Sequence, residues 1–341
     1  MLKTAARRVW RSPETVQFGL DPDRAVVLTG VDDAVAGLLA ALDGSNDTEQ
    51  LRTLAQRLGL PVPDADHLLH DLSTNGVLDD GAAATGLADR HGLRALLPWE
   101  RQQLTADRDV LADQDDEPGR AGRSLQRRRA AAVRVAGAGR VGAQISLLLA
   151  AAGVANVEPV DAGVVQPADL APGGLPPTAL DVARSQAVRD RIAELAPSAG
   201  TGAVDPDVVV LVGAGAQPQA NDLLRAGVAH LAIDIRSGST LVGPFVHPGR
   251  SACLGCLDRL RTDRDPAWPT IAAQLSVPGE GLIDAPSSAA VAALATLQVL
   301  MHIDGGRPTA TNALIDVRLP DGFAVRRALA PHPLCGCTWP G

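Results

Sequence analysis

The stretch Ala132-Val-Arg-Val-Ala136, followed at once by Gly137-Ala-Gly139-Arg-Val-Gly142, decides the fold. It predicts a short apolar strand, a Gly-x-Gly-x-x-Gly turn and a helix, in which glycines let the backbone approach a phosphate and the helix N-terminus attracts it. Val157–Val160 predicts the next strand, which ends at Asp161, an acidic residue about twenty positions on that can accept hydrogen bonds from ribose hydroxyls. The pattern predicts a dinucleotide-type α/β fold with these candidate nucleotide-binding residues: Gly137, Gly139, Gly142 and Asp161.

The segments that follow continue this pattern. Asp207–Val212 and Leu231–Ile235 are apolar runs typical of buried strands, and Ala179–Leu195 and Asn221–Ala226 are expected to be helical. We therefore predict an open, mainly parallel sheet with helices on both faces.

The end of the chain predicts a long helix and a closing hairpin. Ser287–Met301 is almost uncharged, so we expect a helix buried either in this core or between two copies. Symmetric pairing is common among oligomers, and we therefore predict a homodimer. Ala313–Leu319 and Gly322–Arg327 predict an antiparallel pair.

All four cysteines of the chain lie in two pairs, Cys253/Cys256 and Cys335/Cys337. Two distant pairs can supply the four thiolates of a closed, structural zinc site. The Cys-x-Cys pair is tight, so His332 is an alternative ligand. A redox Cys-x-x-Cys remains an alternative, although no thioredoxin-like unit surrounds it, and so do two disulfides in an oxidising compartment.

Residues 1–80 predict a small α+β unit. Val16–Leu20 and Arg24–Leu28 predict a hairpin, and Val77-Leu78 a short strand. Between them we expect three helices, which begin after Asp32-Asp33, after Asn46-Asp47 and at Asp64. This order predicts a winged-helix-like topology.

The charge of this unit opposes the DNA binding that such a topology usually suggests. Residues 64–80 carry five aspartates and no lysine or arginine, so they would repel phosphate. An extended peptide could instead add to the hairpin edge and contact the third helix. A purely structural appendage is the alternative.

Residues 81–130 form a predicted linker region before the second domain, 131–341. Asp113–Gly122 is acidic and then glycine-rich, which is typical of a flexible connection. We interpret Arg127–Arg129 as a solvated edge before the first strand, with an acidic partner as the alternative.

Composition narrows the class of protein. The 341-residue chain has a formal net charge of −8, which argues against general nucleic-acid binding. We expect no apolar run to reach the length of a membrane span, and the start of the chain lacks an apolar signal region. We therefore expect a cytoplasmic protein that contacts neither membrane nor nucleic acid.

The first unit, over roughly residues 12–80, resembles the PqqD-like peptide-recognition domain, which binds leader peptides of ribosomally made, modified peptides. The resemblance implies that a leader lies between Arg24–Leu28 and Asp64–Asn75. The peptide-binding candidates are Arg24, Val26, Leu28, Leu68 and Leu72.

Residues 130–341 resemble the ThiF-like, ubiquitin-activating-enzyme-like adenylating fold, through the glycine turn with Asp161 and the two cysteine pairs. The resemblance implies that the turn and the Asp hold ATP and that the cysteines hold zinc. It also implies an Asn, a Lys and a magnesium-binding Asp. This sequence has Asp169, Gln186 and Gly213-Ala-Gly215 at those positions. Several such losses make adenylation improbable, because one preorganised charge typically contributes roughly 10²–10³ in rate.

The block from Cys253 to Pro269 resembles actinobacterial leader-peptide-binding proteins of thiazole/oxazole-modified peptide pathways, the cyclodehydratase-partner type. Together the resemblances imply a non-catalytic scaffold that presents a precursor peptide to an ATP-dependent YcaO-type cyclodehydratase. Zinc is then the cofactor, and ATP is possible but not favoured. Two alternatives stay open: an active adenylyltransferase that uses Arg184 beside the glycine turn, and a peptide sensor outside any modification pathway.

Overall fold

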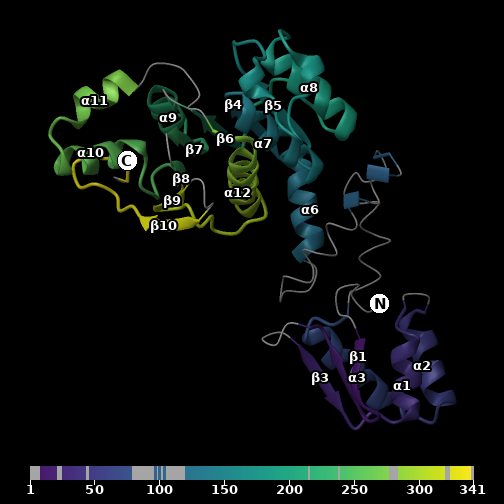
Figure 1. Ribbon diagram of the computed structural model, residues 1–341. Coiled ribbons are helices and arrows are strands. Elements are labelled where there is room, and N and C mark those ends of the chain that lie inside the picture. Colours follow the sequence, from purple (N-terminus) through teal and green to yellow (C-terminus); the bar gives the residue numbers. More distant parts are fainter. Residues whose placement is uncertain are drawn as a thin grey trace. The chain divides into compact units, whose positions relative to one another are not determined.

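The computed structural model describes residues 8–20, 25–43, 46–78, 96–97, 99–100, 103–104, 120–213, 216–236, 239–275, 283–318 and 323–338. The chain divides into two compact units, Met1–Gln126 and Arg127–Gly341. Each unit is described by itself below (Figure 1).

The first unit contains a three-stranded antiparallel sheet in the order β1-β2-β3, formed by Arg8–Ser12, Thr15–Phe18 and Val26–Thr29. The predicted hairpin corresponds to β2 and β3, whereas β1 was not predicted. All five residues of β1 are exposed, so its sequence lacks the alternation by which half-buried strands are recognised. In place of the predicted strand at Val77-Leu78 there is only a single bridge residue, Leu78.

Three helices complete this unit: α1 (Asp33–Ala40), α2 (Thr48–Arg57) and α3 (Val62–Thr74). The predicted caps of the first two are confirmed, since Asp32 accepts a hydrogen bond from Val35 N at 2.8 Å and Asp47 and Gln50 form a capping box. The third helix begins two residues before the predicted Asp64, because a proline is tolerated in the first turn.

The core of the first unit joins the sheet to the helices. Its fully buried members include Val16, Phe18, Leu38, Leu39 and Ala55. A separate small cluster of Leu96, Leu104 and Leu125 lies in the region predicted as a linker.

The helix α6 (Arg120–Ala130) leads into the second unit, and it corrects the prediction of a solvated edge at Arg127–Arg129. Arg128 is 5% exposed and its Nε lies 2.9 Å from Asp304 Oδ1, while Arg127 donates to the Asp304 backbone carbonyl. The two arginines therefore anchor the end of α6. The predicted flexible segment is described only from residue 120, because residues 105–119 lie outside the described residues.

The second unit is built on a seven-stranded sheet in the order β10-β9-β8-β7-β6-β4-β5. The parallel half consists of β4 (Ala132–Ala136), β5 (Asn156–Val160), β6 (Val208–Val212) and β7 (Ala229–Arg236). Strands β8 (Ser239–Val246), β9 (Ala313–Arg318) and β10 (Ala324–Ala328) extend it antiparallel. The sheet is therefore mixed. Strand β8 was not predicted, and it contains Gly243 and Pro244, which are uncommon inside a strand.

Helices cover both faces of this sheet. The helix α7 (Arg140–Ala151) packs beside α12 (Ala285–Ile303) and α8 (Arg184–Leu195), and Figure 1 shows α7 and α12 side by side. The helices α9 (Ala216–Arg225) and α10 (Leu254–Arg264) pack against each other, α9 contacts β6 and β7, and α11 (Trp268–Leu275) follows α10.

Two 3₁₀ turns, at Pro167–Asp169 and Pro177–Ala179, lie between β5 and α8. They bring Asp169 back toward the start of α8.

Within the described residues, α12 is the one helix long and apolar enough to cross a membrane, which corrects the expectation that no run reaches that length. Half of its most apolar window is buried, and it contacts α7, β7 and β8 as a core helix does.

Candidate functional site

The four cysteine sulfurs meet in one cluster. The 253–256 pair stands where β8 ends and α10 begins, with Cys253 as the N-cap residue of α10. The Sγ–Sγ distances are 3.9 Å for Cys253–Cys256, 3.5 Å for Cys253–Cys335 and 3.3 Å for Cys256–Cys337. All four sulfurs lie within 4.8 Å of one another. Tetrahedral zinc with bonds of about 2.3 Å places its sulfurs about 3.8 Å apart, so the set fits zinc. The distances are far too long for disulfide bonds.

Glycine allows the second pair to converge. Gly336 adopts a left-handed conformation, with φ +75°, between Cys335 and Cys337. The tail is thereby held against the start of α10 in a small core with Val246, Ala252 and Leu329. Four sulfurs close the coordination shell and leave no position for substrate, so such a centre is structural.

Burial and hydrogen bonds shift the pKa values of three thiols in this cluster, those of Cys253, Cys256 and Cys337. Burial raises the pKa of Cys253 to about 11 and also raises that of Cys337, which is further raised by its hydrogen bond to Cys256. Burial also acts to raise the pKa of Cys256, but hydrogen bonds, first from the His332 backbone, outweigh it and lower this pKa. Metal binding would therefore displace protons from this cluster.

The side chain of His332, which was the alternative zinc ligand, is bonded to other groups. Its Nε2 lies 3.0 Å from Asp263 Oδ2, and its Nδ1 accepts a hydrogen bond from Leu334 N at 3.1 Å. Both ring nitrogens are therefore engaged, and His332 supports the centre through its backbone.

The glycine turn is shaped by packing. Gly137 has φ +100°, and a Cβ there would lie 2.7 Å from the Val212 carbonyl oxygen. A Cβ on Gly142 would lie 1.7 Å from the Gly137 oxygen, so α7 can approach the turn only with glycine at this position. Gly139 is the N-cap residue of α7.

Asp161 follows β5, as predicted, but both of its carboxylate oxygens accept hydrogen bonds from the protein. Oδ2 accepts from Ala138 N at 2.8 Å, within the glycine turn, and Oδ1 accepts from Gly163 N at 2.6 Å. Two of the roughly four acceptor sites of this carboxylate are therefore used within the protein.

The arginine nearest the turn is tied to carboxylates. Arg184 Nε lies 2.8 Å from Asp169 Oδ2, and its NH1 lies 3.6 Å from Asp161 Oδ2. Asp169 is 3% exposed and also accepts a hydrogen bond from Gln166 N. We call Asp161, Asp169 and Arg184 the aspartate–arginine cluster; its two carboxylates outnumber its one guanidinium, so the cluster has a net negative charge at the edge where a nucleotide would bind.

Two other polar side chains near this edge make hydrogen bonds within the protein, although the buried Arg140 Nε has no partner among the described residues. Gln186 donates to Asp190 on the surface of α8, and Arg140 NH1 donates to the Ile283 carbonyl at 2.9 Å. Gly213 follows β6 with φ +96°, and Gly215 lies outside the described residues.

One polar network, at the end of β7, was not predicted from the sequence. Asp234 pairs with Arg236, and Arg261 of α10 lies 4.0 Å from the same carboxylate and 4.6 Å from the centre of the Trp268 ring. Asp234 stands inside an apolar strand, and only the β7–α10 packing shows its partners.

The peptide-binding candidates of the first unit lie at and below an edge of the small sheet. β3 is an edge strand on which half-buried Val26 and Leu28 alternate with exposed residues. Leu68 is half-buried on α3, whereas Leu72 is 2% exposed and belongs to the core. Arg24 lies outside the described residues.

Comparison with known proteins identifies related folds. The ThiF family model matches residues 116–338. A search of curated protein sequences gives no match.

Three solved structures resemble the chain at low sequence identity. The microcin C7 biosynthetic enzyme MccB in complex with N-formylated MccA has a TM-score of 0.70 and 13% identity, covering 99% of both chains. E. coli MccB with ATP has a TM-score of 0.67 and 14% identity, covering 99% of this chain and 98% of that one. PaaA has a TM-score of 0.69 and 15% identity, covering 96% of this chain and 99% of that one. At these identities the likeness shows the fold.

Proposed function

Because this chain belongs to the ThiF family, we propose that it is a non-catalytic member, a scaffold that binds the leader of a ribosomal precursor peptide and presents it to an ATP-dependent YcaO-type cyclodehydratase. The cysteine set would hold a structural zinc ion. The scaffold would act in the cytoplasm by raising the effective concentration of peptide at its partner.

The aspartate–arginine cluster carries this proposal. Adenylation needs cationic groups that are free to meet the charge developing on a transferred phosphoryl group. Here the guanidinium of Arg184 faces two carboxylates, of which Asp169 is almost fully buried. An incoming triphosphate would face a buried aspartate and would gain no unpaired cation from Arg184.

The peptide would join the first unit at β3. An extended chain added to this edge gains main-chain hydrogen bonds, and alternate side chains could contact Val26, Leu28 and Leu68. The likeness to MccB in complex with N-formylated MccA supports the proposal that this fold holds a binding partner.

We also propose a homodimer formed through α12. Its outer face carries Pro286, Ala289, Ala290, Ala293 and Leu297, and Leu297 is 57% exposed. A second copy would cover this apolar stripe. Light scattering should show a dimer, and Leu297→Glu should shift it to monomer.

Calorimetry with ATP and magnesium, together with mass spectrometry of peptides that co-purify from the native host, tests the scaffold. We expect a co-purifying precursor peptide and no ATP binding at up to millimolar nucleotide. Micromolar ATP binding with pyrophosphate exchange would overturn it. This would favour the second candidate, an adenylyltransferase, for which the likeness to MccB with ATP is the supporting observation.

A further inference from the structure

The strand β1 differs from its neighbours because its core-facing side is uncovered. Trp10 pairs with Val16 and Arg8 pairs with Phe18, and paired residues project from the same face of a sheet. Val16 and Phe18 are buried in the core, whereas Trp10 is 44% exposed. The helices therefore cover β2 but leave Trp10 open.

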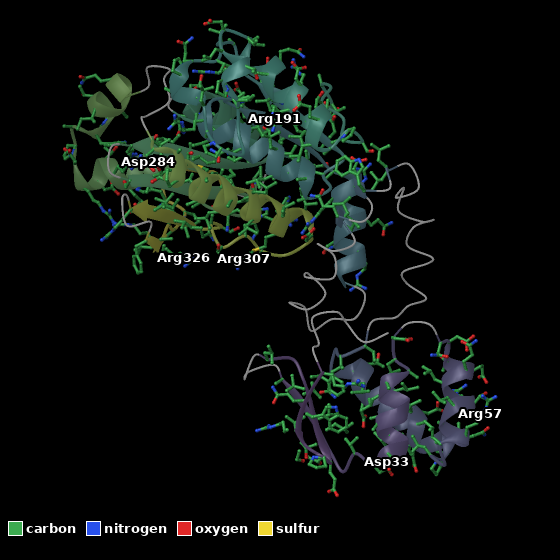
Figure 2. All side chains as sticks on the ribbon, turned by 45° about the vertical axis from the view of Figure 1, so that its right-hand side comes forward. Asp33, Arg57, Arg191, Asp284, Arg307 and Arg326 are labelled. Carbon is green, nitrogen blue, oxygen red and sulfur yellow. The ribbon has the colours of Figure 1, made fainter. Side chains whose placement is uncertain are left out.

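A pocket of about 390 Å³ lies beside this tryptophan. It runs from Trp10 and Arg11 of β1 to Val31, Asp33 and Ala36 at the start of α1. Val31 is 3% exposed, so the pocket has an apolar floor that continues the core. Figure 2 shows Asp33 on this unit, and the carboxylate of Asp32 is engaged in capping α1.

Among the described residues, no strand pairs with the outer edge of β1. In the described sheet β1 hydrogen-bonds to β2 alone and stands at the end of the strand order. Its outer backbone groups can therefore accept an added strand, whose side chain beside Trp10 would enter the pocket.

The charge of this segment is opposite to that of the whole chain. Residues 1–12 contain Lys3, Arg7, Arg8 and Arg11 and no acidic residue, in a protein with a net charge of −8. Arg8 and Arg11 stand near the two ends of β1 and are exposed. Opposite charges across neighbouring strands stabilise their pairing, so acidic side chains suit this edge.

We propose that β1 and its pocket dock an extended segment of a partner protein in which acidic residues alternate with large apolar ones. An apolar side chain fills the pocket between Trp10 and α1. The acidic side chains that alternate with it are attracted chiefly to Arg11, because Arg8 shares the face of Trp10. Because the leader is assigned to β3, at the opposite edge, one sheet can hold both polypeptides at once.

Fluorescence anisotropy on the full-length protein tests this proposal. The probes are two capped, fluorescein-labelled decapeptides, one alternating Leu with Glu and the other alternating Leu with Lys. We expect saturable binding of the Glu peptide, at least tenfold tighter than the Lys peptide, with an affinity that falls as salt rises.

Matched variants locate the site. Trp10→Ala and Arg11→Glu should each weaken binding of the Glu peptide at least tenfold. Trp99→Ala, at a tryptophan of similar exposure (45%), and Arg57→Glu, on α2 (Figure 2), should change it less than twofold. Circular dichroism checks the folding of each variant, and Arg11 is exposed, so its replacement should leave the fold intact.

Three outcomes would overturn the proposal: no saturable binding, equal binding of the two peptides, or unchanged binding in both β1 variants. Loss of binding in Val27→Glu, on the opposite edge strand, would also overturn it, since it would move the site to β3. A precursor peptide that displaces the probe would show that the leader, and not a partner protein, occupies β1.

Discussion

At the scale of single residues, the cysteines and the glycines have separate tasks. The sulfur separations of 3.3–3.9 Å place four thiols where only a cation can stabilise their ionised forms together. The glycines of the turn have no side chain, so that α7 and the end of β6 can approach the turn closely.

Replacing a sulfur ligand should remove both metal and stability. We expect Cys256→Ser to abolish stoichiometric zinc and to lower the free energy of unfolding by more than about 4 kcal/mol, as loss of a structural metal does. Elemental analysis and denaturant titration measure the two effects. His332→Ala is the control, and it should keep one zinc per chain because both nitrogens of His332 serve other partners.

Gly142→Ala should destabilise the second unit by about 1–3 kcal/mol or more, since its Cβ would stand 1.7 Å from the Gly137 oxygen. Gly202→Ala is the matched control, because no atom lies within 4 Å of the added Cβ. Equal melting temperatures for the two variants would contradict this account of the turn.

At the scale of elements, contacts between distant segments fix the ends of helices. The end of α6 is tied to the C-cap residue of α12 by Arg128 and Asp304, whose side chains are 6% and 16% exposed. A second contact joins the end of β8 to the last turn of α12. The rings of Phe245, His247 and His302 form a cluster whose centroids are 5.0 Å apart.

Arg128→Ala should cost about 3–5 kcal/mol, because it leaves the Asp304 carboxylate partly buried without its guanidinium partner. Arg225→Ala removes an ion pair whose side chains are 75% and 77% exposed, and it should cost at most about 1 kcal/mol. Urea titration of both variants provides the comparison.

The ring cluster should make stability depend on pH. Burial, then the charges of His302, Arg250 and Arg307, lower the pKa of His247, and burial lowers that of His302 against an opposing effect of Asp207. The unfolded chain therefore binds more protons than the folded one as the pH falls. Stability present above about pH 6.5 should decline as the pH falls through the lower folded-state pKa values.

His302→Phe should make this decline shallower by up to about 1.4 kcal/mol per pH unit. Unfolding titrations between pH 7 and pH 5, at equal zinc content, measure the slope. An identical slope in the wild type and the variant would rule out a contribution from His302.

At the scale of the whole molecule, two units with different surfaces share one acidic chain. In the ThiF-type unit, the guanidinium of Arg184 beside the glycine turn is paired with the carboxylates of Asp161 and Asp169. The small unit has two edge strands in its described sheet, β1 and β3; β1 is basic, and the helix α3 of the same unit is acidic.

Asp169→Asn should partly release Arg184 and make ATP binding measurable by calorimetry, because it removes the closer of two carboxylates. Pyrophosphate exchange should stay absent, since Gln186 and Gly213 supply no charge. Asp190→Asn is the control: Asp190 is exposed on α8, the helix that carries Arg184, and this variant should not bind ATP. Tight ATP binding by the unmodified chain would contradict the proposal that Asp161 and Asp169 occupy the guanidinium of Arg184.

The sequence by itself determined the elements whose signals are local. Strand β4, the glycine turn, α7, β5 with Asp161, the cysteine pairs and the caps Asp32 and Asp47 could all be read from spacing and residue type. Periodicity and capping act within a few residues, so one sequence contains them.

Only the tertiary structure decided what each polar group contacts. Arg128 pairs with Asp304, and Arg184 lies between Asp161 and Asp169. Both ring nitrogens of His332 make hydrogen bonds, and the strands β1 and β8 are present although they were not predicted. Most of these contacts join residues that are 15 to 176 positions apart along the chain, and the two strands depend on packing, so local sequence patterns do not record them.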